Sequence, residues 1–241
     1  MHRTTLGDFE LTVVSDGTYF LDGGAFFGVV PKTLWSKKVT PDEQNRLDAG
    51  LNSLLVRSGG KNILIETGIG NKLPERMAKI YGQPAKLLEN LGTAGVSPED
   101  IDIVINTHLH FDHCGGNHLY VGRPIYVQRR ELDDALSRDD YTIREWVEAP
   151  GVQYVPVDGE LEVLPGLRLV PAPGHTPGSQ VVVVETGGRP VVIAGDTAVF
   201  FGELDEPRTE GQRLVRALDP ELVWLSHEHQ PWRPQADRAG H

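Results

Sequence analysis

The sequence predicts an α+β protein in which two β-sheets pack face to face and helices cover their outer faces. Short apolar runs bounded by glycine and proline recur along the chain, which is typical of strands. Segments with helical spacing of apolar residues accompany these runs in both halves, and this mixture favours layered sheets with helices outside. Because the 241 residues contain no sharp linker and no low-complexity segment, we expect one domain over residues 1–241.

The first half supplies four expected strands and three helical segments. The glycines at 59–60 allow the tight turn of a hairpin. Pro84 is expected to interrupt or restart a helix, and Ser97 is expected to cap a short helix or turn that has Pro98 in its first position. The strands are expected at residues 9–17, 51–60, 61–68 and 101–108, and the helical segments at 73–82, 84–92 and 96–100.

The second half repeats this style. Strands are expected at residues 124–128, 152–157, 167–175, 179–186, 189–196 and 222–227, with a helix at 210–218. Residues 19–46 lack clear periodicity. They are expected to form a long loop of the kind that serves as a lid or an oligomer contact.

Composition and charge restrict the classes of partner. The formal net charge is -11, the isoelectric point is near 5.2 and no run of lysine and arginine occurs, so nucleic acid is not an expected partner. No signal-peptide pattern and no run of about 18 apolar residues occur, so we expect no membrane association and a cytoplasmic location. Cys114 is the only cysteine, which excludes an intrachain disulfide, and it is expected to be a small packing residue.

The stretch "THLHFDHCGG" places His108, His110, Asp112 and His113 within six positions. Imidazole nitrogens and carboxylate oxygens are the ligands that zinc prefers. Histidines two apart on an extended segment project to the same side, and the next two groups follow after a turn, where they can serve a second ion. The glycines that follow let the backbone bend closely around such a site. This density of ligands predicts a metal centre.

Further candidate ligands occur singly, each at the end of an expected strand, where layered sheets collect functional groups. They are His175 in "PGHTPGS", Asp196 in "AGDT" and His227 in "SHEH". His229 is the alternative to His227, which we favour because it comes first after the strand and is least free to move. The remaining histidines, His2, His118 and His241, are expected to be ordinary polar residues.

Taken in order, "HLHFDH", "PGHTPGS", "AGDT" and "SH" resemble the motifs of the metallo-β-lactamase superfamily, and the resemblance extends from "LTVVSDG" to "LVWLSHEH". It implies a four-layer αββα sandwich with metal ions in a cleft at the sheet edges. It also implies two divalent ions, with zinc preferred and manganese or iron as alternatives. The implied ligands are His108, His110 and His175 for the first ion, Asp112, His113 and His227 for the second, and Asp196 as a bridge between them.

The segment "LDGGAFFGVVPKTLW" is similar to a bacterial subgroup that includes quorum-quenching acyl-homoserine lactonases and organophosphate hydrolases. The resemblance implies attack of metal-bound hydroxide on an ester or lactone carbonyl. Asp112 and Asp196 would orient the nucleophile, and one of them would pass a proton to the departing alkoxide.

Two departures from the subgroup matter. Glu66 in "LIETG" replaces an aspartate that many members carry, and it is a candidate to accept a hydrogen bond from a ligand imidazole. Its alternative role is that of a solvated carboxylate at a strand end. Val199 stands where the best-known lactonases have a tyrosine that helps to polarise the carbonyl, so lactone specificity is an open question here.

Four phenylalanines are candidates to line an apolar substrate pocket, although packing in the core or at a dimer contact is the simpler interpretation. They are Phe26, Phe27, Phe200 and Phe201. An exposed "AFFGVV" would be an apolar patch that requires a partner, so we expect a homodimer with this segment at or near its interface.

Two other reactions compete with ester or lactone hydrolysis. The same site suits a phosphotriester or phosphodiester hydrolase, but the chain shows no nucleic-acid-binding arm of the kind that nuclease relatives carry. An iron-dependent sulfur dioxygenase would use similar ligands for the first ion. The second ligand set, which includes His227, favours the hydrolase.

Overall fold

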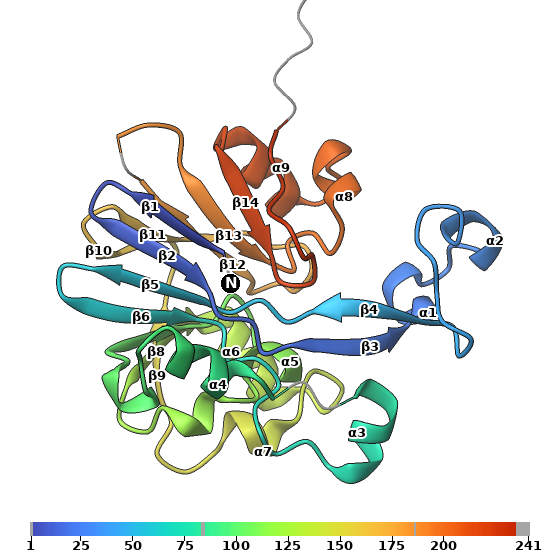
Figure 1. Cartoon of the computed structure of the whole chain (residues 1–241), viewed down its shortest axis with the longest axis horizontal. Coiled ribbons are helices and arrows are strands. Elements are labelled where there is room, and N and C mark those ends of the chain that lie inside the picture. Colours follow the sequence, from blue (N-terminus) through green and yellow to red (C-terminus); the bar gives the residue numbers. More distant parts are fainter. Residues whose placement is uncertain (1, 83–84, 186, 235–241) are drawn as a thin grey trace, which may run out of the picture.

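The computed structural model describes residues 2–82, 85–185 and 187–234, except for the side chain of Phe201. Its strands form two large sheets that face each other, and a smaller two-stranded sheet projects to one side (Figure 1). The larger sheet has the strand order β1-β2-β5-β6-β7-β8-β9, and the other large sheet has the order β10-β11-β12-β13-β14.

The seven-stranded sheet is antiparallel from β1 to β6 and parallel from β6 to β9. Ser58 lies opposite Lys61 in the β5–β6 hairpin, and the two glycines between them have positive φ angles of 56° and 75°, which confirms the predicted tight turn. The strands are Arg3–Leu6 (β1), Phe9–Val13 (β2), Leu54–Ser58 (β5), Lys61–Ile65 (β6), Ile103–Ile105 (β7), Pro124–Gln128 (β8) and Gln153–Val157 (β9).

The five-stranded sheet is antiparallel from β10 to β13, whereas β13 and β14 run parallel. Every residue of β12 and β13 is buried, as expected for the unbroken apolar runs that encode strands covered on both faces. The strands are Leu161–Leu164 (β10), Leu167–Pro171 (β11), Gln180–Val184 (β12), Val191–Gly195 (β13) and Leu222–Leu225 (β14).

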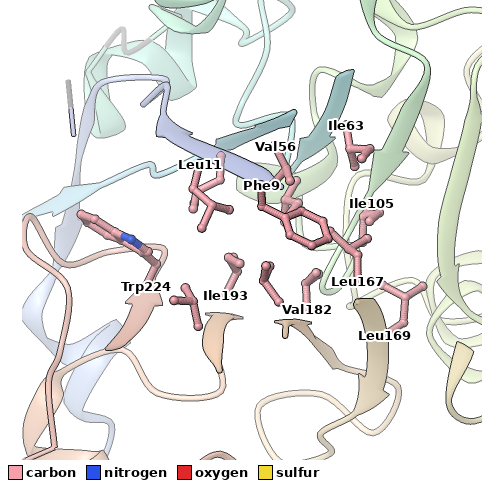
Figure 2. Packing of buried hydrophobic residues seen from close by; sticks show 14 of the residues in the cluster. Phe9, Leu11, Val56, Ile63, Ile105, Leu167, Leu169, Val182, Ile193 and Trp224 are labelled. Atoms are coloured by element: carbon pink, nitrogen blue, oxygen red, sulfur yellow. The ribbon is translucent and has the colours of Figure 1, made fainter. Parts of the chain in front are cut away.

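The main core lies between the two large sheets. Figure 2 shows side chains from β2, β5, β6 and β7 facing side chains from β11, β12, β13 and β14. Ile63, Ile105 and Val182 are completely buried in this layer. Burying a side chain of this size contributes about 1.5–3 kcal/mol, so the contact between the sheets is a major source of stability.

Helices cover the outer face of each sheet, which confirms the predicted αββα arrangement (Figure 1). Leu87 and Leu91 of α4 pack against the outer face of the seven-stranded sheet, and Leu204 of α8 and Val215 of α9 pack against the five-stranded sheet. The helices on these faces are Leu87–Thr93 (α4), Phe111–Cys114 (α5), Arg129–Ser137 (α6), Arg144–Val147 (α7), Phe201–Asp205 (α8) and Glu210–Ala217 (α9), whereas Glu75–Tyr81 (α3) packs against the two-stranded sheet.

Local signals for helix ends are confirmed where the structure describes them. Ser97 caps a 3₁₀ turn at Pro98–Asp100 through a capping box with Asp100, as expected from "VSPED". A second 3₁₀ turn spans Asn117–Leu119. Pro84, expected to interrupt the helix, lies outside the described residues. None of the described helices has the length and apolar character needed to cross a bilayer.

Residues 19–46, expected to form a long loop, are instead part of a folded arm. Strands β3 (Thr18–Asp22) and β4 (Arg46–Gly50) pair in an antiparallel ladder, and helices α1 (Gly23–Phe27) and α2 (Lys32–Trp35) lie at its tip (Figure 1). The ring of Trp35 is buried against Gly23, at a position where any side chain would collide with it. Residues 23–45 lie between β3 and β4, so the pairing of these strands leaves no short-range pattern in the sequence.

The two large sheets are joined at one edge by backbone hydrogen bonds. The N–H of Gln180 donates to the carbonyl of Thr107 at 2.9 Å, and the N–H of Asn52 donates to the carbonyl of Ser226 at 2.9 Å. The parallel pairs β6–β7 and β13–β14 both end at this edge. Residues that directly follow these strands are therefore brought together from distant parts of the sequence.

Candidate metal centre

The motif that follows β7 folds back as a tight loop and one helical turn. His108 is completely buried, and its Nε2 lies 3.2 Å from Nδ1 of His110, so the two rings face a common point as expected. His110 caps α5, which carries Asp112 and His113, both buried. The backbone at Gly116 packs against the carbonyl of Thr67 so closely that no side chain would fit there. This contact explains why the motif ends in glycine.

The three distant candidates reach the same place. Nε2 of His175 lies 3.0 Å from Nδ1 of His110, although 65 positions separate them. Asp196 directly follows β13, and its Oδ2 lies 3.0 Å from Nε2 of His227, which follows β14. The fold therefore brings together all seven side chains that the sequence singled out as ligands.

Their nitrogen and oxygen atoms form three overlapping groups that can hold a metal ion. The groups are His108, His110 and His175; His108, His113 and Asp196; and Asp112, His113 and His227, with the ligand atoms of each group within 4.8 Å of one another. Oδ2 of Asp196 lies 3.5 Å from Nε2 of His175 and 3.5 Å from Nε2 of His113. This one carboxylate oxygen thus faces both the first and the third group.

Two polar atoms of the cluster are buried without a hydrogen-bond partner among the described residues, and such atoms indicate whether the residues suit a cation. Within the part of the chain that the structure describes, Nε2 of His113 and Oδ1 of Asp196 are buried and have no hydrogen-bond partner. A buried polar atom without a partner costs about 1–3 kcal/mol. A positive ion between them would satisfy both atoms, so the donor set fits divalent metal ions.

The pKa values of the histidines shift in opposite directions at the two ends of the cluster. Burial lowers the pKa of His108 well below its ordinary value and lowers that of His110 to about 4, so both imidazoles are neutral, which is the form that binds metal. Burial also opposes the charged form of His113, but the carboxylates of Asp196 and Asp112 outweigh it and raise the pKa of His113 well above its ordinary value. The carboxylates of Asp112 and Asp196 therefore favour positive charge around His113.

Hydrogen bonds beyond the cluster orient its members. Nδ1 of His227 lies 2.8 Å from the carbonyl of Gly50, which directs Nε2 toward Asp196. Glu66 accepts a hydrogen bond from the N–H of Thr107 at 2.7 Å, and its other oxygen lies 3.5 Å from Nδ1 of His113. Glu66 is buried, so the alternative of a solvated carboxylate at a strand end is wrong.

The other residues singled out by type lie elsewhere. His229 is mostly exposed and pairs with Asp48 at 2.9 Å, away from the cluster. His118 contacts Asn71 at 2.8 Å. Cys114 is completely buried and burial raises the pKa of its thiol, so it is a packing residue as expected. His241 lies outside the described residues.

No sequence pattern marked Glu131, yet this buried carboxylate of α6 holds two ligand loops. Its Oε1 accepts hydrogen bonds from the N–H of Leu109, between His108 and His110, at 2.8 Å and from the hydroxyl of Tyr141 at 2.6 Å. Its Oε2 accepts from the hydroxyl of Thr176, next to His175, at 2.6 Å. The helix on which Glu131 lies therefore fixes the spacing between the two loops.

A cavity of about 350 Å³ opens over the cluster. Its walls combine metal-site residues with apolar side chains and two tyrosines, namely Tyr19, Leu21, Ala25, Phe26, His110, Phe111, Asp112, Tyr141, His175, Asp196, Val199 and His227. The sequence had suggested no role for Tyr19, which burial and the carboxylates of Asp112 and Asp196 keep protonated by raising its pKa well above its ordinary value.

The expected phenylalanine pocket is only partly formed. Phe26 lines the cavity, with its ring centroid 5.4 Å from that of Phe200. Phe27 is stacked between Trp35 and Phe200, at centroid distances of 4.9 and 5.3 Å. It therefore packs against other aromatic rings and is not among the residues that line the cavity. The side chain of Phe201 lies outside the described part of the structure.

Fold and site together define a two-sheet protein with a clustered histidine and carboxylate metal centre at the edge where the sheets meet. The chain belongs to the metallo-beta-lactamase superfamily, whose family model matches residues 48–227. It is 41% identical over 141 residues to an N-acyl homoserine lactonase of Bacillus thuringiensis, a match that covers 58% of this chain and 54% of that protein. The chain thus spans about half the length of the curated relatives it matches.

Solved structures share the fold along almost the whole chain. A probable metal-dependent hydrolase of Staphylococcus aureus superposes with a TM-score of 0.75 at 22% identity, over 93% of this chain and 91% of that one. A dizinc quorum-quenching lactonase in complex with its product superposes with a TM-score of 0.74 at 20% identity, over 99% of this chain and 95% of that one.

Replacement of His227 is expected to lower the metal content, whereas replacement of His229 is not. His227→Ala deletes a buried nitrogen of the third group, so the variant should bind less divalent metal per chain than the wild type. His229→Ala serves as the matched control because it removes an exposed imidazole from the same loop. Metal content after dialysis, measured by mass spectrometry, checks this; equal metal content in the two variants would contradict the assignment.

Replacement of Glu131 by alanine should destabilise the protein strongly. Three donors lose their acceptor, and the free energy of unfolding should fall by about 3 kcal/mol or more. Asp133→Ala, an exposed change on the same helix, should stay within about 0.5 kcal/mol of the wild type. Urea unfolding of the three proteins makes the comparison, and similar midpoints for all of them would show that Glu131 holds nothing in place.

Proposed function

We propose that the protein is a binuclear metal-dependent hydrolase that cleaves an ester or lactone bond. In this proposal His108, His110 and His175 bind one ion, and Asp112, His113 and His227 bind the other. Asp196 bridges them. The observation that carries the proposal is the place of Asp196, whose Oδ2 lies 3.0 Å from His227 and 3.5 Å from His175, members of the two different sets.

Two divalent ions, when bound, lower the pKa of a water molecule and supply a hydroxide nucleophile near neutral pH. The chain contributes the orientation of the reacting groups. Asp112 and Asp196 are the carboxylates that face the cavity, so they are placed to hold the proton of the nucleophile and to pass it to the departing alkoxide. His175, the most exposed of the ligands, lies on the open side of the centre.

The walls of the cavity favour an uncharged substrate. Among the described residues that line it, none is lysine or arginine, so no cationic side chain is present to pair with an anionic group. Leu21, Phe26 and Phe111 instead offer apolar surface to a hydrocarbon chain. An N-acyl homoserine lactone, the substrate class in the names of the curated relatives, has this combination of a neutral ester and an apolar chain.

The competing reactions fit less well. A phosphotriester is also uncharged and is the second candidate, whereas a phosphodiester would bring a negative charge into a cavity without a cationic side chain. A sulfur dioxygenase needs only the first group of ligands, and the gathering of Asp112, His113 and His227 would then have no use. For the metal, we propose zinc, because each ion would have four ligands that are imidazole nitrogens or carboxylate oxygens, a set that suits zinc.

The first test is hydrolysis of a long-chain N-acyl homoserine lactone by zinc-loaded protein, followed by acid release. Activity should disappear on chelation and return with zinc. Asp196→Asn should reduce it at least about 100-fold, since the bridging carboxylate is lost. Turnover of a phosphotriester but not of the lactone would replace the first candidate by the second. Normal turnover in Asp196→Asn would overturn the bridged two-metal site.

We also propose that the protein forms a homodimer through the arm tip. Val29 is fully exposed, and Val30 and Leu34 are more than one third exposed, so apolar side chains gather on α2 and the loop before it. Val29→Asp combined with Leu34→Asp should convert a dimer to a monomer. Light scattering coupled to size-exclusion chromatography measures this, with Val121→Asp, an exposed valine away from the arm, as the control. A monomeric wild type would refute the proposal.

A further inference from the structure

Tyr19 connects the arm to the metal centre. It lies on β3, its side chain is only 2% exposed, and its hydroxyl donates a hydrogen bond to Oδ2 of Asp112 at 2.9 Å. The ring centroid lies 5.5 Å from that of His227, and the residue also lines the cavity. Among the described residues of the arm, Tyr19 is the one whose side chain makes a hydrogen bond to Asp112.

Asp112 has little else to fix it. Helix α5 is a single turn of four residues, too short to be rigid by itself. The nearest imidazole nitrogens, Nε2 of His113 and Nε2 of His227, lie 3.6 and 3.7 Å from its Oδ2, beyond hydrogen-bonding distance. Among the described side chains, the phenol of Tyr19 is thus the one that makes a hydrogen bond to this carboxylate.

The second tyrosine that lines the cavity, Tyr141, has its hydroxyl bonded to a different acceptor. Tyr141 donates to Glu131 at 2.6 Å, which directs its hydroxyl away from Asp112. Val199 lines the cavity with a side chain that cannot form hydrogen bonds. Tyr19 is therefore the tyrosine in this wall whose hydroxyl bonds a proposed metal ligand.

We propose that Tyr19 is a positioning residue, whose hydroxyl holds Asp112 in the orientation that the second ion requires. This proposal rests on the two-metal hydrolase proposed above. A carboxylate oxygen has two lone pairs, so Oδ2 can accept the phenol hydrogen while the carboxylate binds a cation. Hydrogen bonds that orient metal ligands in this way commonly raise metal affinity about 10- to 100-fold.

The test compares Tyr19→Phe with the wild type and with Tyr81→Phe. Phenylalanine keeps the ring that packs in the arm and removes only the hydroxyl. Tyr81 is the matched control, since its ring lies 6.2 Å from that of Tyr19 and it does not line the cavity. Metal-free proteins are titrated with cobalt against a competing chelator, and the visible absorption bands of the two bound ions are followed.

In Tyr19→Phe, the affinity for the second ion should fall at least about tenfold while that for the first ion stays within about twofold. At saturating zinc, kcat for the lactone should also fall, with little change in KM, because the substrate walls are intact. Tyr81→Phe should match the wild type in both measurements. Unchanged affinity for the second ion in Tyr19→Phe, or an equal loss in Tyr81→Phe, would overturn the role of Tyr19.

The wild-type titration separates this proposal from the function on which it rests. A wild type that binds a single ion, or that binds two and hydrolyses neither lactone nor phosphotriester, contradicts the proposed function. A wild type that binds two ions and hydrolyses the lactone, together with an unaffected Tyr19→Phe, contradicts the role of Tyr19 alone.

Discussion

The charge balance of seven side chains at one sheet edge is the constraint on which the rest of the structure depends. Five imidazoles and two carboxylates meet there, and five of the seven groups are buried: His108, Asp112, His113, Asp196 and His227. Buried ionisable groups persist only when they are paired or coordinate a metal. Protein atoms alone leave His113 and Asp196 each with an unsatisfied atom. A positive ion placed between these two atoms would satisfy both of them.

Such a cluster needs loops that cannot relax, and buried carboxylates hold them. Glu131 joins the loop of His110 to the loop of His175. Asp16 accepts hydrogen bonds from the N–H groups of Ile69 and Leu87 at 2.9 Å, and burial, which these bonds oppose, raises its pKa to about 6. It thus fixes the segment after β6 that packs against the glycines of the histidine motif. Each carboxylate accepts hydrogen bonds from two separate loops and so fixes their positions relative to each other.

Sequence patterns were sufficient to predict those features that depend on residues close together in the sequence. Apolar runs marked ten of the twelve strands of the two large sheets and missed the edge strands β1 and β10, whose residues are exposed or only partly buried. Ligand chemistry marked the seven side chains that the fold gathers in one cluster. Patterns failed where a partner lies far along the chain. Strands β3 and β4 stabilise each other across the arm, so neither carries a signal of its own. Glu131 looks like any helix-surface acid in sequence, because its burial depends on Leu109, Tyr141 and Thr176, which only the fold brings to it.

The contacts that join the arm to the metal-site residues both stabilise the arm and place its side chains in the cavity wall. A two-stranded ribbon is marginally stable in isolation, and this one pairs with neither large sheet. It is tied to the site by the hydroxyl of Tyr19 on Asp112 and by the carbonyl of Gly50 on His227. A ligand that binds only the native arrangement stabilises it by mass action. Ions held by Asp112 and His227 would thus also fix Leu21 and Phe26, the arm's part of the cavity wall.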